Sequence, residues 1–561
     1  MAMVPIPLAD QSNEGRDFRD GSGRLINCYV EPRGKEGRHA APVYPVDGLR
    51  AWTQLPVPVS SSEPDGSILL ETGDLYDEGD NLLNEDGGEF LLEGDPFINQ
   101  LENPTYGVQV ILEDRGSLWV ITGNGVYKVS SGGVATFIGG IAVSSAVTAD
   151  KNRVNQIGIV SDGYYYVLDT VTETLTGYTD QLTFSPNSVV HYNGYMVVTY
   201  SNGAFQHSGL NDATTFSIND VGIAQYRGDG AFRALVMGLD LIVFGSESIE
   251  FWQDVGNTNA FTYSRLGGLE IGISAPLSAV NVGETICWID EDYEVQMLMG
   301  YQAKAIGTPY ISRKIREAAS PETIRGLSYS RDGHTFYSIS TTEFTLTYNM
   351  ATNLWHEEKS YGLNRRRAAC ATRWGKTIYA GDYIDAQIFT IDRDYHRDLT
   401  TPLVMEVITP PVHMWPEKVR FRTLFIDALF GTGLKPDVDE TEANRMINDP
   451  QPAVGEPFDL DRSGDPLAWT ASNPLTEVPA DSVAADEEEP KLMVYVSEDG
   501  GENFVFLEEL SLGDINSKYE ELRVQGIGTS GQNGFVFRFV CSSPVVRGIL
   551  GAHADVTKVR A

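Results

Sequence analysis

Three consecutive arginines, Arg365 to Arg367, are the tightest cluster of cationic side chains in the sequence. Guanidinium groups that converge can bind the carboxylate of a substrate, as the arginine cluster of a sialidase does. Consecutive residues of a strand point to opposite faces, however, so these three side chains are not expected to meet on one carboxylate. We therefore expect them in a solvated loop between repeats or at a contact between subunits.

A second pattern, S-x-D-x-G-x-x-F, spans Ser497 to Phe504 and matches the Asp box of sialidase propellers. Such a box is a turn device, because its Ser and Asp side chains bond the backbone of a hairpin. The pattern occurs once, and Ser330 to Gly333 resembles it only loosely. We predict a structural hairpin at this position and no substrate site.

Other partial motifs lack residues that their chemistry requires. The segment from Asp459 to Asp465 begins like a calcium loop, but Thr470 stands where a bidentate Glu is needed. The GKT at 375–377 lacks the upstream glycine of a phosphate loop, since that position holds Cys370. The histidines show no metal-binding spacing, and the four cysteines form no CxxC pair. The sequence predicts no catalytic, cofactor-binding or metal-binding residues.

The negative charge of the chain is concentrated in two segments. The 561 residues carry a formal net charge of -37. Residues 56–104 hold 13 acidic residues and no basic one, and residues 432–490 hold 15 acidic residues against three basic ones. A uniformly basic nucleic-acid surface is therefore excluded as a bulk property, because affinity for phosphate comes from Lys and Arg. The first residues lack the pattern of a signal peptide, and no run approaches about 18 apolar residues, so no membrane span is expected.

A repeated pattern organises the middle of the chain, from about Tyr106 to Arg397. Each repeat opens with a glycine-bearing turn followed by an apolar run such as LWVI, YYYVL or YMVVTY. The seven openings begin at Gly116, Gly163, Gly194, Gly238, Gly283, Gly333 and Gly375. Their spacing of about 30 to 50 residues is typical of four-stranded propeller blades stacked against their neighbours. We predict an all-β protein with a β-propeller of six complete blades, or seven if the short third repeat also forms one.

The flanks of this array predict further parts. Residues 1–55 form an extended N-terminal arm that docks on another surface, because its apolar residues are too many to stay solvated. Residues 56–104 are an acidic insert, whose Leu-Leu pairs indicate either short hairpin rungs or a solvated loop. The propeller spans residues 105–398 and is interrupted by a short helix, since Ile311, Ile315 and Ala318 have helical spacing before Pro321.

After the array the pattern changes to longer strands. Residues 399–431 and 491–561 predict one β-sandwich or platform domain, because their alternation resumes after a long interruption. That interruption, residues 432–490, is a second insert that is acidic and rich in Pro. The array and the sandwich are expected to have separate hydrophobic cores.

The chain resembles the tail nozzle, or hub, proteins of short-tailed bacteriophages, which are also called packaged-DNA stabilisation proteins. The similar stretches are INCYVEPRGKEG with VYPVDGLRAW, FWQDVGNTNAFTYSRLGGLEIGISAPLSAVNVGETICWID, IGTPYISRKIREA, and VYVSEDGGENF with FVFRFVCSSPVVRGILGA. The resemblance covers about four-fifths of the chain and leaves out both acidic inserts.

This resemblance implies a structural virion protein without catalytic residues or cofactors. It implies a homohexameric nozzle below the portal, in the virion tail, assembled in the host cytoplasm. Its partners would be the portal adaptor (head-to-tail connector) protein and a tail needle, fibre or tailspike. Double-stranded DNA would be retained and then conducted during ejection without sequence-specific binding. We further expect the arm and the sandwich to form the ring surface, and the propeller to stay folded without the arm.

Two other hypotheses come from different classes of protein. A sialidase-like or carbohydrate-processing propeller enzyme would need a pocket with converging acids, which in most glycosidases lie about 5 to 9 Å apart. A generic propeller scaffold that binds proteins would be monomeric, so its oligomeric mass would distinguish it.

Overall fold

The computed structural model describes residues 2–15, 23–32, 41–56, 107–256, 261–414, 417–429, 490–513, 522–531 and 533–559. The acidic inserts and the segment resembling a calcium loop lie outside these ranges, except that Pro56 and Pro490 are described. The described residues are mostly β-strand, which confirms the all-β class. The chain folds into two compact units. One comprises Asp10–Val30 and Val46–Thr401, and the other Met1–Ala9, Glu31–Pro45 and Pro402–Ala561.

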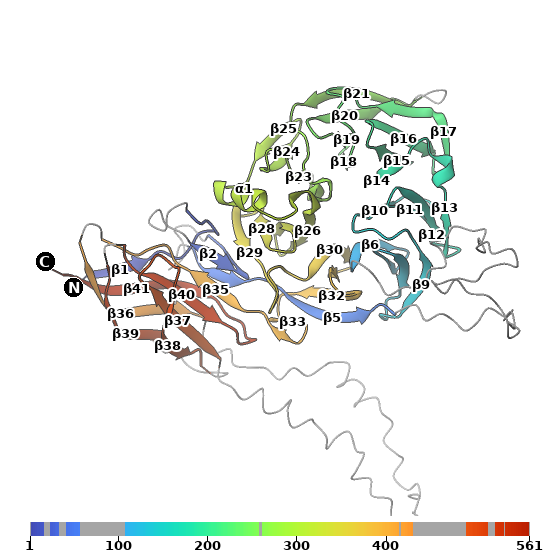
Figure 1. Ribbon diagram of the computed structural model, residues 1–561. Helices are drawn as coiled ribbons and strands as arrows, with labels where there is room; N and C mark the ends of the chain where they lie inside the picture. Colours follow the sequence, from blue (N-terminus) through green and yellow to red (C-terminus); the bar gives the residue numbers. More distant parts are fainter. Residues whose placement is uncertain are drawn as a thin grey trace, which may run out of the picture. The chain divides into compact units, whose positions relative to one another are not determined.

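The larger unit is a β-propeller, as predicted, and it has seven blades (Figure 1). Blades one to five are antiparallel sheets of four strands, and blade six has four antiparallel strands in a larger sheet that continues through β2. The four strands of each of these six blades follow one another along the chain. Their strands are β6 (Val108–Asp114), β7 (Ser117–Thr122), β8 (Gly125–Val129) and β9 (Ala135–Gly140); β10 (Thr148–Lys151), β11 (Gln156–Ser161), β12 (Tyr164–Asp169) and β13 (Thr174–Gly177); β14 (Pro186–Tyr192), β15 (Tyr195–Tyr200), β16 (Ala204–Gly209) and β17 (Asp212–Ile223); β18 (Arg233–Met237), β19 (Asp240–Phe244), β20 (Ile249–Asp254) and β21 (Tyr263–Leu269); β22 (Val280–Val282), β23 (Thr285–Ile289), β24 (Val295–Met299) and β25 (Gln302–Ala305); and β26 (Arg325–Arg331), β27 (His334–Ser340), β28 (Thr345–Asn349) and β29 (Leu354–Glu357).

The seventh blade joins two distant segments of the chain. It consists of β30 (Ala368–Trp374), β31 (Thr377–Asp382), β32 (Gln387–Asp392) and, as its outer strand, β5 (Gly48–Gln54). In β5, Leu49 pairs with Ile391 of β32. The short strand β33 (Arg397–Asp398) runs parallel to β5 on its other edge and is followed by β34 (Thr401–Pro402). The ring therefore closes through residues that precede the array in the sequence.

The seven glycine openings correspond to the seven blades, including the third, which forms the complete sheet β14 to β17. Six of the glycines lie in the turn between the first and second strands, whereas Gly163 lies between the second and third. All seven have φ between 62° and 92°, a region that glycine adopts without a steric penalty. Because Gly163 lies one turn later in its blade than the other glycines do, its interval to Gly194 is the shortest of the series.

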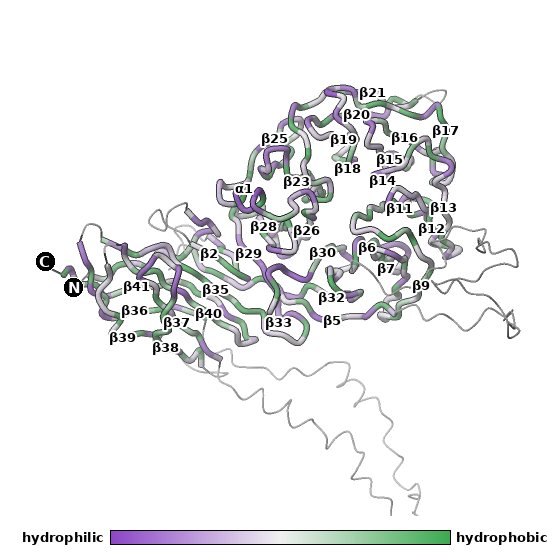
Figure 2. Tube along the Cα trace, viewed as in Figure 1, coloured by the Kyte–Doolittle hydropathy of each residue, from purple (hydrophilic) through white to green (hydrophobic). Residues whose placement is uncertain are grey.

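The hydrophobic core of the propeller lies between adjacent blades, as the continuous apolar runs predict. In β7, Trp119 and Ile121 pack with residues of blade two, while Leu118 and Val120 pack with Ile388 of blade seven. Successive side chains thus face opposite neighbours, so both faces of the strand are buried. Figure 2 shows hydrophobic residues along these strands.

The predicted helix is α1 (Pro309–Arg316), between blades five and six. The side chain of Thr308 caps it by accepting a hydrogen bond from the Ile311 amide, and Tyr310, Ile311 and Ile315 are buried. The helix ends at Arg316, so Ala318 is buried beyond it. Short 3-10 turns occur at η2 (Thr179–Gln181), η3 (Pro276–Ser278) and η4 (Pro321–Thr323). In the part of the chain that the structure describes, no helix has the length and apolar character to cross a membrane.

The N-terminal residues are distributed over both units. Strands β2 (Arg24–Ile26) and β3 (Cys28–Val30) belong with β5 to the propeller unit, where β2 runs parallel to β29. Strands β1 (Ala2–Ile6) and β4 (Val43–Pro45) belong to the smaller unit. Because β5 completes blade seven, the expectation that the propeller stays folded without the arm is corrected.

The smaller unit is a β-sandwich, as predicted. One sheet has the order β4, β41, β36, β39, with β1 also paired to β41, and the other has the order β35, β40, β37, β38. The new bounds are β35 (Met405–Ile408), β36 (Val419–Ala428), β37 (Lys491–Ser497), β38 (Val505–Ser511), β39 (Leu522–Thr529), β40 (Val536–Cys541) and β41 (Ile549–Lys558). Phe421 of β36 meets Phe537 of β40 with ring centroids 5.9 Å apart, so the two sheets bury their apolar faces against each other.

Candidate functional site

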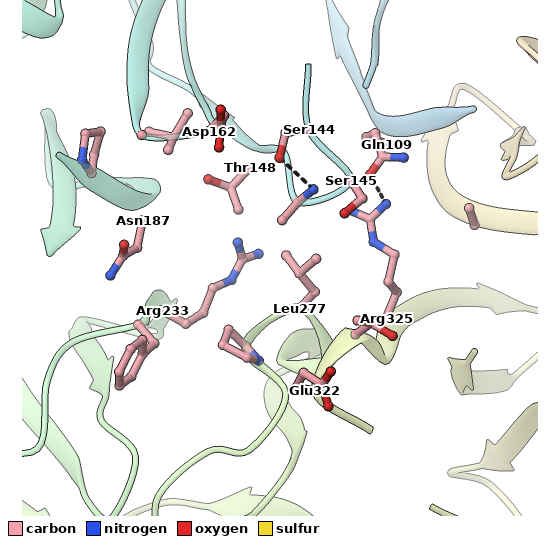
Figure 3. A pocket seen from close by; sticks show the side chains of 18 of the residues that line it. Gln109, Ser144, Ser145, Thr148, Asp162, Asn187, Arg233, Leu277, Glu322 and Arg325 are labelled. Carbon is pink, nitrogen blue, oxygen red and sulfur yellow. Dashed lines mark hydrogen bonds between the residues drawn. The ribbon is translucent and has the colours of Figure 1, made fainter. Parts of the chain in front are cut away.

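A cavity of about 500 Å³ occupies the centre of the propeller (Figure 3). Each blade contributes lining residues from its first strand or from the segment just before it. These residues include Gln109, Thr148, Asn187, Arg233, Leu277, Arg325 and Ala369, in blade order from one to seven. An adjoining cavity of about 240 Å³ shares Gln109, Thr148, Arg233, Leu277, Arg325 and Ala369 with the first. We call the two cavities together the propeller channel.

Two arginines enter this channel from equivalent positions. Arg233 is the first residue of β18 and Arg325 is the first residue of β26. Nε and Nη1 of Arg233 are shielded from solvent and have no hydrogen-bond partner among the described residues. Nη1 of Arg325 donates to Oε1 of Gln109, which lies on β6. Burial lowers the pKa of both side chains, and the charge of Arg325 adds to the decrease at Arg233, whose pKa falls to about 10.

A third arginine, Arg365, lines the channel from the turn before β30. Its side chain is 5% exposed and lies over the ring of Tyr383, with the guanidinium carbon 3.8 Å from the ring centroid. Nε donates to the Arg366 carbonyl oxygen, and Nη2 has no partner among the described residues. Burial lowers the pKa of Arg365 to about 10. Tyr383 raises this pKa, whereas the charge of Arg325 lowers it further. Arg233 and Arg365 therefore stay cationic at neutral pH.

The carboxylates near the channel do not neutralise these cations directly. Asp162 and Glu322 line the cavity but are exposed. Asp150 attracts Arg233, yet its two oxygens accept hydrogen bonds of 2.8 Å from the backbone amides of Lys151 and His191. The channel is therefore a cationic recess in which some guanidinium N–H groups have no acceptor among the described residues. Its acids are not arranged as a buried pair for acid-base chemistry.

The structure separates the three consecutive arginines, as expected, but the expected solvated loop or subunit contact is wrong for two of them. Arg365 and Arg366 are 5% and 4% exposed. Arg366 donates to Glu358 and to the carbonyl oxygen of Asp47. Arg367 donates to Asp382 and, over 2.8 Å, to Asp385. The turn that carries them precedes the innermost strand of blade seven, so their side chains meet different buried partners.

The Asp box forms the predicted hairpin between β37 and β38. Ser497 donates to Asp499 over 2.5 Å and accepts from the Gly501 amide over 2.9 Å. Asp499 accepts from the amides of Glu502 and Asn503. These bonds, led by the one from Asn503, lower the pKa of Asp499. The Ser497 hydroxyl and both carboxylate oxygens of Asp499 are thus engaged in holding the turn.

The remaining partial motifs are turns as well. The GKT at 375–377 lies at the turn between β30 and β31, and Ser330 to Gly333 lies at the turn between β26 and β27. The four cysteines are free thiols. Among the residues with described positions, no group of three His, Cys, Asp or Glu side chains could hold a metal ion.

A buried carboxylate holds the N-terminal segment on blade six. Glu357 accepts hydrogen bonds of 2.9 Å and 2.8 Å from Nε and Nη2 of Arg24. Lys314 donates to it over 2.8 Å, and the Tyr310 hydroxyl over 3.1 Å. Burial by itself would raise the pKa of Glu357, but Arg24 and Lys314 lower it to about 2. The backbone amide of Asn27 also donates to the Glu357 carbonyl oxygen. The N-terminal segment is therefore held at Glu357 both by an ion pair and by a backbone hydrogen bond.

Sequence analysis did not identify Arg233 and Arg325 as candidate residues. The seven openings drew attention to the apolar runs after each glycine, whereas both arginines begin the strand before it. Their common signal is a basic residue at the start of an innermost strand, and it becomes visible only after each strand is assigned its place in a blade.

Comparisons with known proteins agree with the architecture. A protein-family model described as Bacteriophage P22 Gp10, beta-propeller, matches residues 105–396, which include all strands of the seven blades except β5. A comparison with curated proteins finds no match. Among solved structures, the computationally designed Ika8 protein is 9% identical, with a TM-score of 0.33 over 70% of this chain and 100% of that chain. At such a score the structural likeness has no bearing on function.

Proposed function

Because the chain belongs to the bacteriophage P22 Gp10 β-propeller family, and is thus a structural component of a phage tail, we propose that it forms a hexameric nozzle below the portal and adaptor. The nozzle retains packaged DNA and conducts it during ejection. Its partners are the adaptor above and a needle, fibre or tailspike. The observation that carries this proposal is the family match across the blades of the ring.

The size of the propeller channel supports an assembly of several copies. Its cavity of about 500 Å³ is lined by side chains from every blade. A duplex, whose major groove alone is about 12 Å wide and about 8.5 Å deep, is too thick to pass through a cavity of this volume. A conduit for DNA must therefore lie between subunits, around a common axis, and cannot lie inside one subunit.

The charge of the chain supports passage without binding. Each Lys or Arg that contacts phosphate releases counterions and adds affinity, which would slow a moving duplex. A net charge of -37 per chain disfavours such contacts. The lining of the propeller channel, with unpaired arginines in place of converging acids, is likewise consistent with a structural role and not with glycan hydrolysis.

The mass of the purified protein, alone and bound to its adaptor, tests the proposal. Six chains of 61.6 kDa give about 370 kDa, and electron microscopy should show a ring with an open axial channel. Duplexes of unrelated sequence should bind equally weakly, with an affinity that disappears as salt is raised. A monomer at all concentrations, in the presence of adaptor as well, would refute the hexamer. Release of sugars from a host polysaccharide would favour the enzyme hypothesis instead.

A further inference from the structure

We propose that the centre of the propeller binds a small polyanion of the phosphate type, held by Arg233 and Arg325 (Figure 3) together with Arg365. This site is separate from the conduit proposed above, because it lies within one subunit. It requires neither the hexamer nor DNA.

Arg233 and Arg365 keep hydrogen-bond donors that have no acceptor among the described residues. A guanidinium group carries five N–H donors and no acceptor. Arg233 makes no hydrogen bond through its shielded Nε and Nη1, and the buried Arg365 leaves Nη2 without a partner among the described residues. Arg325 has a bond to Gln109 through Nη1. Buried donors are normally paired, so arginines that line one cavity and keep donors without a partner indicate a missing acceptor.

The charges that line the recess favour an anion. Three cations line one recess, and the charge of Arg325 lowers the pKa of both Arg233 and Arg365, in addition to the larger effect of burial. Asp162 and Glu322 line the recess but are exposed. Of the other acids nearby, Asp150 is engaged with backbone amides and Asp382 with Arg367. An anion in the recess would remove the mutual repulsion and accept the free N–H groups together.

The side chains that line the recess indicate the type of anion. A planar guanidinium matches the oxygens of phosphate in pairs, and three of them suit a ligand with several charges better than a single carboxylate. The volume of about 500 Å³ lies within the range of small-molecule sites, roughly 300 to 1,000 Å³. Thr148, Ser144 and Ser145 add hydroxyl groups to the same lining. The whole chain has a formal net charge of -37, so a recess lined by cations differs in sign from the protein as a whole.

Titration of the full-length protein with inorganic pyrophosphate tests this site, by calorimetry and by thermal unfolding at constant ionic strength. We expect saturable binding and a rise in Tm that follows occupancy. Arg325→Gln and Arg233→Gln should each weaken binding at least tenfold. The control is Arg227→Gln, since Arg227 is exposed and paired with Glu270 at 2.6 Å. The affinity of this variant for pyrophosphate should equal that of the wild type.

The Tm of the variants without ligand shows whether the arginines serve to bind a ligand or to stabilise the fold. Because Arg233 has unmet donors and repulsive neighbours, Arg233→Gln without ligand should have a Tm equal to or above that of the wild type. A loss of Tm in this variant would mean that the arginine supports the fold, and would overturn the proposal. So would binding that is not saturable, or equal affinity in the wild type and both variants. A peptide of residues 485–490, ADEEEP, that binds more tightly than pyrophosphate would overturn the assignment to phosphate.

Discussion

Neutralising Glu357 should release the N-terminal segment from blade six. Glu357 is 7% exposed and accepts from Arg24, Lys314 and Tyr310. Its pKa falls from 4.5 to about 2, and each pKa unit corresponds to about 1.36 kcal/mol. The ion pairs therefore contribute about 3 kcal/mol at neutral pH, and solvent screening at the partly exposed Arg24 reduces this to about 2 kcal/mol or more.

The sign of the pH dependence follows from the direction of the shift. Since the folded pKa lies below the unfolded one, the stabilisation is complete above about pH 4.5 and is lost as the pH falls through about 2. Glu357→Gln should thus lower the stability of the docked segment by about 2 to 3 kcal/mol at pH 7 and by only about 1 kcal/mol at pH 3. Other titrating groups are present in both proteins and cancel in the difference.

Hydrogen exchange at two backbone amides measures this effect locally, which is necessary because a chain with two units need not unfold in one step. The amides of Ser12 and Asn27 donate to the carbonyl oxygens of Trp355 and Glu357, both over 2.8 Å, and they exchange only when the segment opens. Glu173→Gln is the matched control, because Glu173 pairs with Lys128 at an exposed site. Unchanged exchange in Glu357→Gln at pH 7, or a difference that stays constant at low pH, would refute the reasoning.

Two further substitutions test the ring closure and the hairpin. Leu49→Ala should destabilise the propeller by about 2 to 5 kcal/mol, because Leu49 is fully buried in β5. Urea unfolding measures this loss, and the exposed Ala51→Ser serves as a control that should have little effect. An unchanged unfolding midpoint would mean that β5 is not needed to close the ring. Asp499→Ala removes acceptors of the Glu502 and Asn503 amides and should cost about 1 kcal/mol, seen as faster proteolysis between β37 and β38 than in Glu498→Ala. Equal cleavage of the two variants would contradict the assigned role of the Asp box.

The propeller could be predicted because its signals are local. Each opening joins a glycine that adopts positive φ to an apolar run, and both are read within about ten residues of sequence. The hairpin at Asp499 was predictable for the same reason, since its bonds span two to four residues. The blade count was less accessible, because Gly163 occupies a different turn of its blade from the other six glycines.

Contacts between distant segments had no such signal. Leu49 meets Ile391 across more than 300 residues of sequence, so nothing near either residue marks them as partners. The prediction for Arg365 and Arg366 failed because the sequence shows the charges but not Tyr383 and Glu358, which bury them. Burial of a charge depends on whether the fold places a partner beside it.

By itself, the sequence determined an all-β chain of repeated four-stranded units, a second sandwich core and the concentration of charge in two inserts. These follow from the period of apolar residues, from turn chemistry and from composition, which are properties of neighbouring residues. Only the tertiary structure decided that β5 closes the seventh blade and that Arg233, Arg325 and Arg365 meet in one channel. A ring brings the first strand of every blade to its axis, so residues separated by whole blades in the sequence come to share one cavity and one electrostatic field.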